Sequence, residues 1–204
     1  MGAGIKIGRI VAMDCETSGI NWKAGSSESK EGVANGYQAV QWGFVISDAS
    51  NFKPIAELEV KIKWNGESAW DLKAENVHGM SKEYLEKHGL DEEEAVVDII
   101  EFFMEHLDIS KPIYVLGHNV GTFDLPFLKD MLLRHGVKNI KFGQRCFDTF
   151  SLSMGTVQQF DSDTLFDKVG YPPRDGHNAL EDAKMALGSF RVINKAWKQM
   201  LKKS

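Results

Sequence analysis

The chain has 204 residues, a formal net charge of −5 at pH 7 and a hydrophobic fraction of 43%. This length suits one domain with a sizeable core, so residues 1–204 are expected to form a single domain, and the composition excludes disordered, collagen-like and membrane-spanning chains. The acidic balance excludes a protein that holds nucleic acid by net positive charge alone.

The first part of the chain is expected to be rich in strands. Arg9–Cys15 has the pattern of a buried strand, whereas the polar stretch Asn21–Gly36 has no hydrophobic period, which predicts a long surface loop. Ala39–Ile46 and Ala56–Lys63 follow as two further strands, the second with apolar residues at alternate positions. None of these apolar runs is long enough to span a bilayer, so no membrane contact is expected.

Helices and strands alternate in the middle of the chain. Ser81–His88 and Asp91–His106 are predicted to be helices, and the second carries a pronounced apolar face. Pro112–Gly117 is a short buried strand that leads into a helix from about Leu125 to Arg134, and Phe142–Phe147 is a fifth strand.

The last helix has the clearest pattern, after some helical material near Leu165. Its apolar residues repeat at spacings of three and four: Ala179, Ala183, Ala186, Leu187, Phe190, Ile193, Trp197, Met200 and Leu201. The order of elements predicts an α/β fold with a mixed five-stranded sheet flanked by helices.

The cellular location is indicated by two absences. No basic segment followed by an apolar run occurs near the N-terminus, so no secretory signal is expected. The two cysteines, Cys15 and Cys146, are too few for a disulfide framework. Both observations favour the cytoplasm.

The first candidate site lies at the end of the first strand. Side chains alternate across a strand, so Asp14 and Glu16 point to one face while Cys15 points to the other. Two neighbouring carboxylates repel each other and are costly to desolvate, and a bound cation removes both problems. The alternative is a pair of solvated acids at a strand terminus with no function.

Asp124 is the second candidate, because it follows a strand and precedes Leu125-Pro126. Asp is a preferred N-cap and Pro belongs in the first helical turn, so a purely structural cap is the alternative. A cap and a metal ligand are compatible, since a helix N-terminus can itself border a phosphate site.

The third candidate is the segment His177–Asp182. Asn178 and Glu181 have the spacing of a capping box, which places His177 in the loop before the helix and Asp182 in its second turn. An entering loop lets the two side chains converge more easily than two positions on one helix. The alternative is a surface histidine and an exposed helical acid.

Together, these residues follow a known order. The segments Asp14–Gly19, Asn119–Asp124 and His177–Asp182 resemble the three motifs of the DEDDh (DnaQ-like) 3′→5′ exonucleases, which include polymerase proofreading subunits, ribonuclease T and oligoribonuclease. The resemblance implies a ribonuclease H-like fold. It extends to Gln41–Val45 as the second strand of the family and to Val77–Ser81 as its "HGIT" segment.

Further along, Asp148-Thr149 resembles the "DTL" that follows the fifth strand of the family. Two features depart from the pattern. Asn119–Asp124 is one residue longer than in many members, a spacing shared with oligoribonuclease-like sequences, and the loop Asn21–Gly36 is longer than the usual connection.

The resemblance implies a catalytic set that acts with two divalent ions. Asp14, Glu16 and Asp182 would hold one ion, and Asp14 would share the second with Asp124. Oxygen ligands select Mg²⁺ or Mn²⁺ over zinc, and two such ions stabilise the attacking and leaving oxygens of an in-line displacement. His177 would take a proton from the attacking water, because its ordinary pKa lies near working pH.

A terminal nucleotide must also be bound. By resemblance, Thr17 contacts the terminal sugar, Ile20 wedges against the last bases and Phe123 stacks on a base, while Val77 and His78 line the same pocket. Core packing is the alternative for Ile20 and Phe123.

Four cations are candidates for steering the phosphate backbone, with a solvated surface as the alternative. They are Arg174, Lys138, Lys141 and Arg145.

The expected function is therefore metal-dependent 3′→5′ exonuclease activity that releases nucleoside 5′-monophosphates from single-stranded nucleic acid, with DNA favoured over RNA. A 3′→5′ exoribonuclease is the alternative within the enzyme class, because RNA recognition depends on contacts to the 2′-OH. A non-catalytic nucleic-acid-binding module on the same fold is the alternative from another class. The expected partner is the 3′ end of single-stranded DNA or RNA, and the sequence indicates no protein partner.

Overall fold

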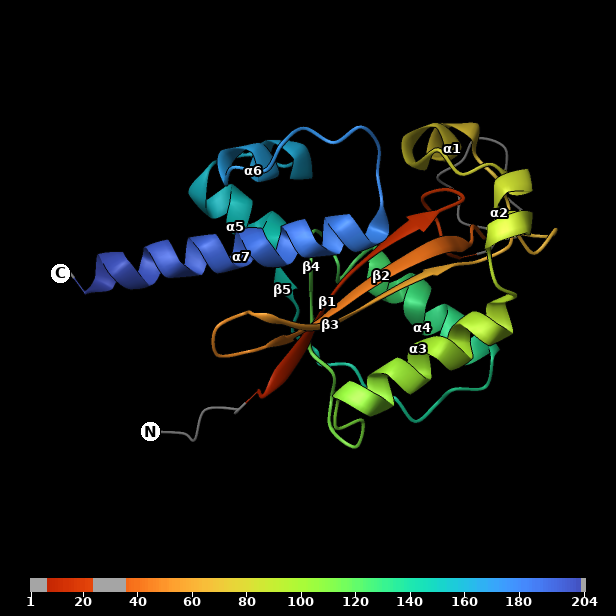
Figure 1. Cartoon of the computed structure of the whole chain (residues 1–204), viewed down its shortest axis with the longest axis horizontal. Coiled ribbons are helices and arrows are strands. Elements are labelled where there is room, and N and C mark those ends of the chain that lie inside the picture. The colour runs from red at the N-terminus through yellow and green to blue at the C-terminus, as the bar shows by residue number, and fades with distance from the viewer. Residues whose placement is uncertain (1–6, 24–35, 203–204) are drawn as a thin grey trace.

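The computed structural model describes residues 7–23 and 36–202, so residues 24–35 of the predicted loop Asn21–Gly36 lie outside it. Five strands form one sheet in the order β3-β2-β1-β4-β5 (Figure 1). The strands are β1 Arg9–Thr17, β2 Ala39–Asp48, β3 Pro54–Lys61, β4 Val115–Gly117 and β5 Phe147–Asp148. β1 pairs antiparallel with β2 and parallel with β4, which confirms the predicted mixed sheet.

Seven helices accompany the sheet in the described part of the chain. They are α1 Leu72–His78, α2 Lys82–His88, α3 Glu92–His106, α4 Asp124–Arg134, α5 Thr149–Thr156, α6 Ser162–Lys168 and α7 Ala179–Leu201. The predictions for α2, α3, α4 and α7 are confirmed within one or two residues, and α6 contains Leu165. α1 and α5 were not predicted.

Side-chain alternation along β1 builds a core on each face of the sheet. Met13 and Cys15 pack with residues of α3 and α4, whereas Ala12 packs with residues of α6 and α7. Figure 1 shows the same layers, with α7 crossing one face and α3 and α4 on the other. The face under α7 is the one that receives Asp14 and Glu16, two and four residues after Ala12.

Two predicted strands are shorter than expected. Within the predicted range Pro112–Gly117, Ile113 makes only an isolated bridge to Phe142, and the strand begins at Val115. Within the predicted range Phe142–Phe147, only Phe147 belongs to β5. The pairing at this bridge is limited to two backbone hydrogen bonds, in which the Ile113 N–H donates to the Lys141 carbonyl at 2.8 Å and the Gly143 N–H donates to the Ile113 carbonyl at 2.7 Å.

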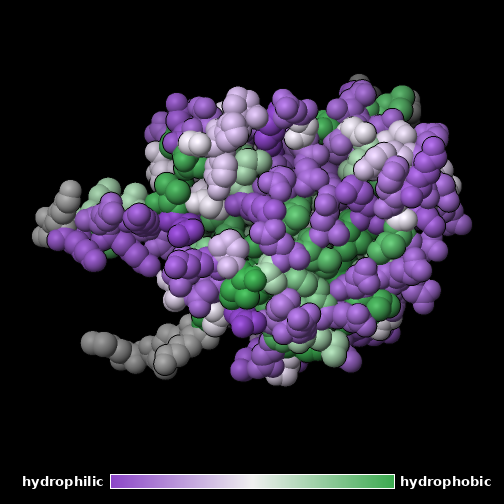
Figure 2. Space-filling view, in the orientation of Figure 1, coloured by the Kyte–Doolittle hydropathy of each residue, from purple (hydrophilic) through white to green (hydrophobic). Residues whose placement is uncertain are grey.

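The first and last halves of α7 have different surroundings. Its first apolar positions are buried against the sheet, but Trp197 is 58% exposed and Leu201 is 61% exposed. Figures 1 and 2 show this end projecting beyond the body of the molecule. No helix in the described ranges combines the length and the apolar character needed to span a bilayer.

Candidate active site

β1 delivers the first two carboxylates. In the pairing with β2, Asp14 lies opposite Gly43 and Glu16 lies opposite Gln41. Cys15 points the other way and joins the core under α3 and α4. The predicted alternation is therefore confirmed. Glu16 is only 6% exposed, so its carboxylate is not the solvated acid of the alternative reading.

The N-terminus of α7 delivers the third carboxylate and the histidine. The Asn178 side chain accepts a hydrogen bond from the Glu181 backbone N–H at 3.1 Å, which confirms the predicted cap. Gly43 lets this helix end approach β2, since a Cβ there would lie 2.2 Å from the Ala179 carbonyl carbon. Gln41 Oε1 then accepts from the Ala179 N–H at 3.1 Å and fixes the helix end to the sheet.

Asp124 comes from the N-terminus of α4, but it does not cap that helix. Phe123 occupies the cap position, and no side-chain cap bond is present there. The Asp124 Oδ1 atom instead accepts the Cys15 backbone N–H at 2.9 Å. With an exposure of 1%, Asp124 is tied to β1 beside Asp14, so the alternative of a purely structural N-cap is excluded.

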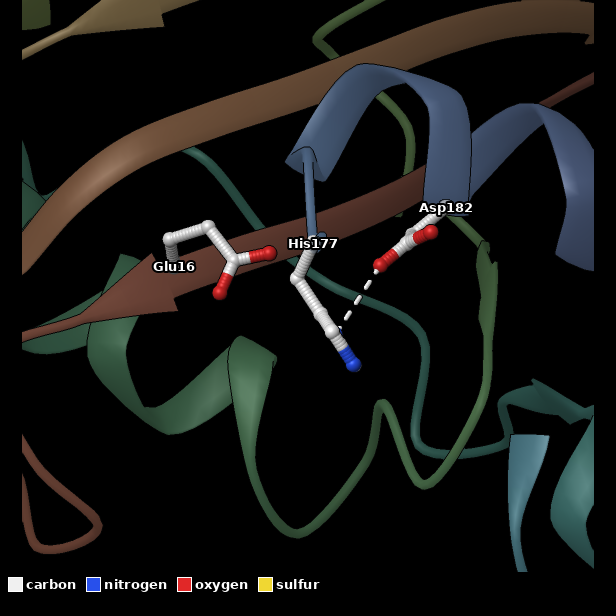
Figure 3. A group of neighbouring side chains, drawn as sticks. All are labelled: Glu16, His177 and Asp182. Carbon is white, nitrogen blue, oxygen red and sulfur yellow. Dashed lines mark ion pairs between the residues drawn. The ribbon is translucent and has the colours of Figure 1, made fainter. Parts of the chain in front are cut away.

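His177 and Asp182 meet as expected from an entering loop. The His177 Nδ1 atom lies 3.3 Å from Asp182 Oδ2, and Figure 3 shows Glu16 on the other side of the histidine ring. Ligand atoms of Glu16, His177 and Asp182 all lie within 4.8 Å of one another. Asp14 and Asp124 are not members of this group.

Four carboxylates crowd one site, of which Glu16, Asp124 and Asp182 are buried and Asp14 is half-buried. Burial raises the pKa of Asp14 well above its ordinary value, and Asp124, Glu16 and Asp182 raise it further. Burial likewise raises the pKa of Glu16 to about 7 and that of Asp124 to about 7. The hydrogen bond to Asp182 raises the pKa of His177, because it stabilises the charged ring.

The carboxylates fit a divalent cation. One oxygen of each of three buried side chains has no hydrogen-bond partner: Glu16 Oε1, Asp124 Oδ2 and Asp182 Oδ1. Buried carboxylate oxygens without partners are costly, and hard cations such as Mg²⁺ and Mn²⁺ prefer oxygen ligands of this kind. The donor set therefore suits a hard cation better than zinc, which is usually bound through Cys and His.

A pocket of about 260 Å³ opens over Glu16 and Asp182, and Asp124 lies behind Asp14 without lining it. All five residues predicted to bind substrate line it together with Asp14, Glu16, His177 and Asp182: Thr17, Ile20, Val77, His78 and Phe123. Ile20 is 68% exposed, so core packing is excluded for it. Phe123 both packs against the core and lines the pocket.

The four cations considered for phosphate steering separate into two groups. Arg174 lines the pocket, and its side chain is 9% exposed. Lys138, Lys141 and Arg145 are exposed and do not line it, which favours the solvated surface. Asp148 was predicted only as part of a motif. Its Oδ1 atom accepts the Asn119 and Phe150 backbone N–H groups, both at 2.9 Å, so it fixes the start of the segment that leads to Asp124.

Because the carboxylate pKa values are raised in the folded protein, we expect the metal-free protein in EDTA to lose stability as the pH rises. The ordinary pKa values of Glu16 and Asp124 are 4.5 and 3.8, and the folded values are about 7. Between about pH 4 and pH 7 these two carboxyl groups therefore bind more protons in the folded protein than in the unfolded chain, so their contribution to stability falls as pH rises. We expect a lower melting temperature at pH 7.5 than at pH 5.5 in EDTA.

Mn²⁺ should reverse this loss at pH 7.5. A ligand at 100 times its Kd adds about 2.7 kcal/mol, or roughly 5–10 °C for a domain of this size. Thermal melts at the two pH values, with EDTA or Mn²⁺, measure both effects. Equal melting temperatures in EDTA, together with no response to Mn²⁺, would show that the carboxylates are not a metal site.

Comparisons with known proteins support the family resemblance and the fold. A family model described as RNase T exonuclease matches residues 11–190. The zinc-bound E. coli exonuclease I complex with single-stranded DNA is similar in fold, with a TM-score of 0.76 and 13% identity over 97% of this chain and 43% of that chain. Another E. coli exonuclease I structure, in complex with a dT13 oligonucleotide, has a TM-score of 0.77 and 13% identity, with the same coverage.

Exonuclease I from Methylocaldum szegediense has a TM-score of 0.69 and 17% identity over 93% of this chain and 41% of that chain. This chain thus spans less than half the length of these proteins. A search of curated proteins gives no match.

Proposed function

This chain belongs to the RNase T family of exonucleases, and from that premise we propose that it releases nucleoside 5′-monophosphates, one at a time, from the 3′ end of single-stranded nucleic acid. The observation that carries the proposal is the convergence of Asp14, Glu16, Asp124 and Asp182 beside His177, with three buried oxygens left without partners. A module that only binds nucleic acid has no need for such a costly cluster.

Two Mg²⁺ or Mn²⁺ ions are the proposed cofactors. Asp14, Glu16 and Asp182 would hold one ion, and Asp14 would share the other with Asp124. When bound, such ions stabilise the charge that develops on the attacking and leaving oxygens of an in-line displacement at phosphorus. The unpartnered oxygens of Glu16, Asp124 and Asp182 support this assignment.

His177 is the proposed general base. Its Nδ1 atom faces Asp182 Oδ2 at 3.3 Å, which leaves Nε2 for the attacking water. The Asp182 carboxylate orients the ring and stabilises the imidazolium that forms when Nε2 takes the proton. His177 also borders the pocket, so the protonated ring lies where the phosphate would enter.

The pocket residues supply the proposed grip on the 3′-terminal nucleotide. The backbone N–H of Met80 donates to His78 Nδ1 at 3.1 Å, so the neutral ring carries its proton on Nε2. Burial lowers the pKa of His78, which keeps this ring neutral. The exposed side chains of Ile20 and Val77 offer apolar contacts to bases at the pocket rim. Thr17 and Phe123 complete the proposed sugar and base contacts.

Single-stranded DNA is the proposed substrate class. The support is the fold likeness to exonuclease I structures in complex with single-stranded DNA, dT13 or dA16. Stacking and apolar contacts are tolerant of sequence, which suits an enzyme that degrades any strand.

A cytoplasmic location remains a prediction that is compatible with both cysteines being free. A single domain over residues 1–204 also remains a prediction.

Matched DNA and RNA oligomers test the substrate class. With Mn²⁺ or Mg²⁺, we expect faster release of mononucleotides from single-stranded DNA than from RNA of the same sequence. A DNA oligomer with one 2′-hydroxyl at its 3′-terminal sugar is the matched control, because it changes only the group that separates the two classes. Faster degradation of RNA would make the protein an exoribonuclease, and release from neither would leave a binding module.

A further inference from the structure

Arg174 makes a set of contacts that the proposed chemistry does not use. Its Nη1 atom lies 2.6 Å from Asp182 Oδ2, and both side chains are less than 10% exposed. Its other nitrogen atoms face the start of α6: Nε donates to Asp163 Oδ1 at 2.8 Å, and Nη2 donates to Ser162 Oγ at 3.0 Å. The guanidinium also lies 5.1 Å from the Phe166 ring centroid. Arg174 therefore joins α6 to the carboxylate of α7.

These contacts fix the guanidinium from the side opposite Asp182. Asp163 is 67% exposed, so its ion pair is screened by water and contributes little energy. The geometry of the contact matters more than its energy. The Arg174 guanidinium is planar, so hydrogen bonds to Nε and Nη2 leave Nη1 little freedom to move. The Phe166 face adds a further restraint.

Asp182 consequently has one oxygen held and one oxygen available. Oδ2 faces Arg174 and His177, while Oδ1 is buried without a partner. Asp124 shows the same division, since Oδ1 accepts the Cys15 N–H and Oδ2 has no partner. In both residues, anchoring one oxygen aims the other, which is how groups behind a metal ligand usually orient it.

We propose that Arg174 is a positioning residue that holds Asp182 in the orientation in which its free oxygen can bind a divalent cation. The inference rests on the proposed function, because it assigns Asp182 to the metal site. Two effects of Arg174 oppose each other. Its charge alone repels a cation, so its removal would strengthen binding if charge were decisive. Its hydrogen bond orients the ligand, so its removal weakens binding if orientation is decisive.

Calorimetric titration with Mn²⁺ alone separates these effects. We expect Arg174→Ala to weaken Mn²⁺ binding by about 10–100-fold, the usual cost of losing a group behind a metal ligand. Arg174→Lys should fall between the wild type and Ala, because a lysine can pair with Asp182 but cannot also span to α6. Asp163→Asn is the matched control: it loosens the far end of Arg174, leaves the Asp182 pair intact and should weaken binding less than Arg174→Ala.

Melting temperatures in EDTA complete the test. Unchanged Mn²⁺ affinity with a lower melting temperature would make Arg174 only a bridge between α6 and α7 and overturn the proposal. Tighter Mn²⁺ binding by Arg174→Ala would also overturn it and make Arg174 a competitor for the carboxylate. If Arg174→Ala does not fold, the Mn²⁺ affinities of Arg174→Lys and Asp163→Asn are compared instead. Weaker binding by Arg174→Lys than by Asp163→Asn supports the proposal, and equal binding by both overturns it. Failure of the wild type to bind Mn²⁺ would instead refute the proposed metal site itself.

Discussion

Asp14→Asn is expected to lower the exonuclease rate by at least about 10³-fold and, in EDTA at pH 7.5, to raise the melting temperature. Asp14 is the only proposed ligand of both ions, and losing several kcal/mol of charge stabilisation corresponds to a loss of this size. The same substitution removes the carboxylate that Asp124, Glu16 and Asp182 crowd, so the metal-free fold gains stability. Stability and activity should therefore move in opposite directions.

Steady-state rates and thermal melts of one preparation measure both quantities. Asp98→Asn is a matched control, because Asp98 is an exposed acid on α3 that does not line the pocket, and it should change neither. If Asp14→Asn keeps its exonuclease activity, the carboxylate cluster around Asp14 does not catalyse the reaction. A lower melting temperature in EDTA would show that Asp14 has a stabilising contact in the metal-free protein.

His177→Ala is expected to lower kcat by about 10²–10⁴-fold, the usual contribution of a general base. The wild-type rate should rise with pH as His177 loses its proton, through a pKa that Asp182 raises above the ordinary value of 6.5. This rise of the rate with pH should be absent in His177→Ala. His88→Ala, at an exposed histidine of α2, should leave the profile unchanged.

Calorimetry with Mn²⁺ decides between two roles of His177, because its ring lies within the same 4.8 Å group as Glu16 and Asp182. If His177 is a general base, the Mn²⁺ affinity of His177→Ala should be nearly unchanged. If His177→Ala loses the metal while Asp182→Ala keeps it, His177 is a ligand and the assignment is wrong.

The parts of the fold that could be predicted are those in which burial imposes a pattern on the sequence. β1 and β2 bury nearly every side chain, and the first half of α7 buries one continuous stripe. α1 buries only His78, so no apolar period marks it, although Asp71 caps its start and Gly79 follows its end with a φ of 70°. α5 buries only Thr149 and Ser153, which give no hydrophobic signal.

The candidate site divides in the same way. Local spacing in the sequence predicts that Asp14 and Glu16 share one strand face and that His177 lies beside Asp182. The partner of Asp124 could not be predicted, because its bond to the Cys15 backbone joins residues 109 positions apart and a local cap also accounts for an Asp at this position. The sequence indicates Arg174 only as a candidate for phosphate steering. Its place three residues before His177 was the available signal, but its contacts with Asp163 and Asp182 depend on how α6 packs near α7.

The polarity of strand degradation tests the central claim most directly. One single-stranded DNA oligomer is labelled at its 5′ end, and a second copy at its 3′ end, and both are incubated with the protein and Mn²⁺. We expect the 5′ label to give a ladder that shortens by single nucleotides, and the 3′ label to appear at once as a mononucleotide. Immediate release of the 5′ label, or cleavage of a closed circular single strand, would contradict a 3′→5′ exonuclease.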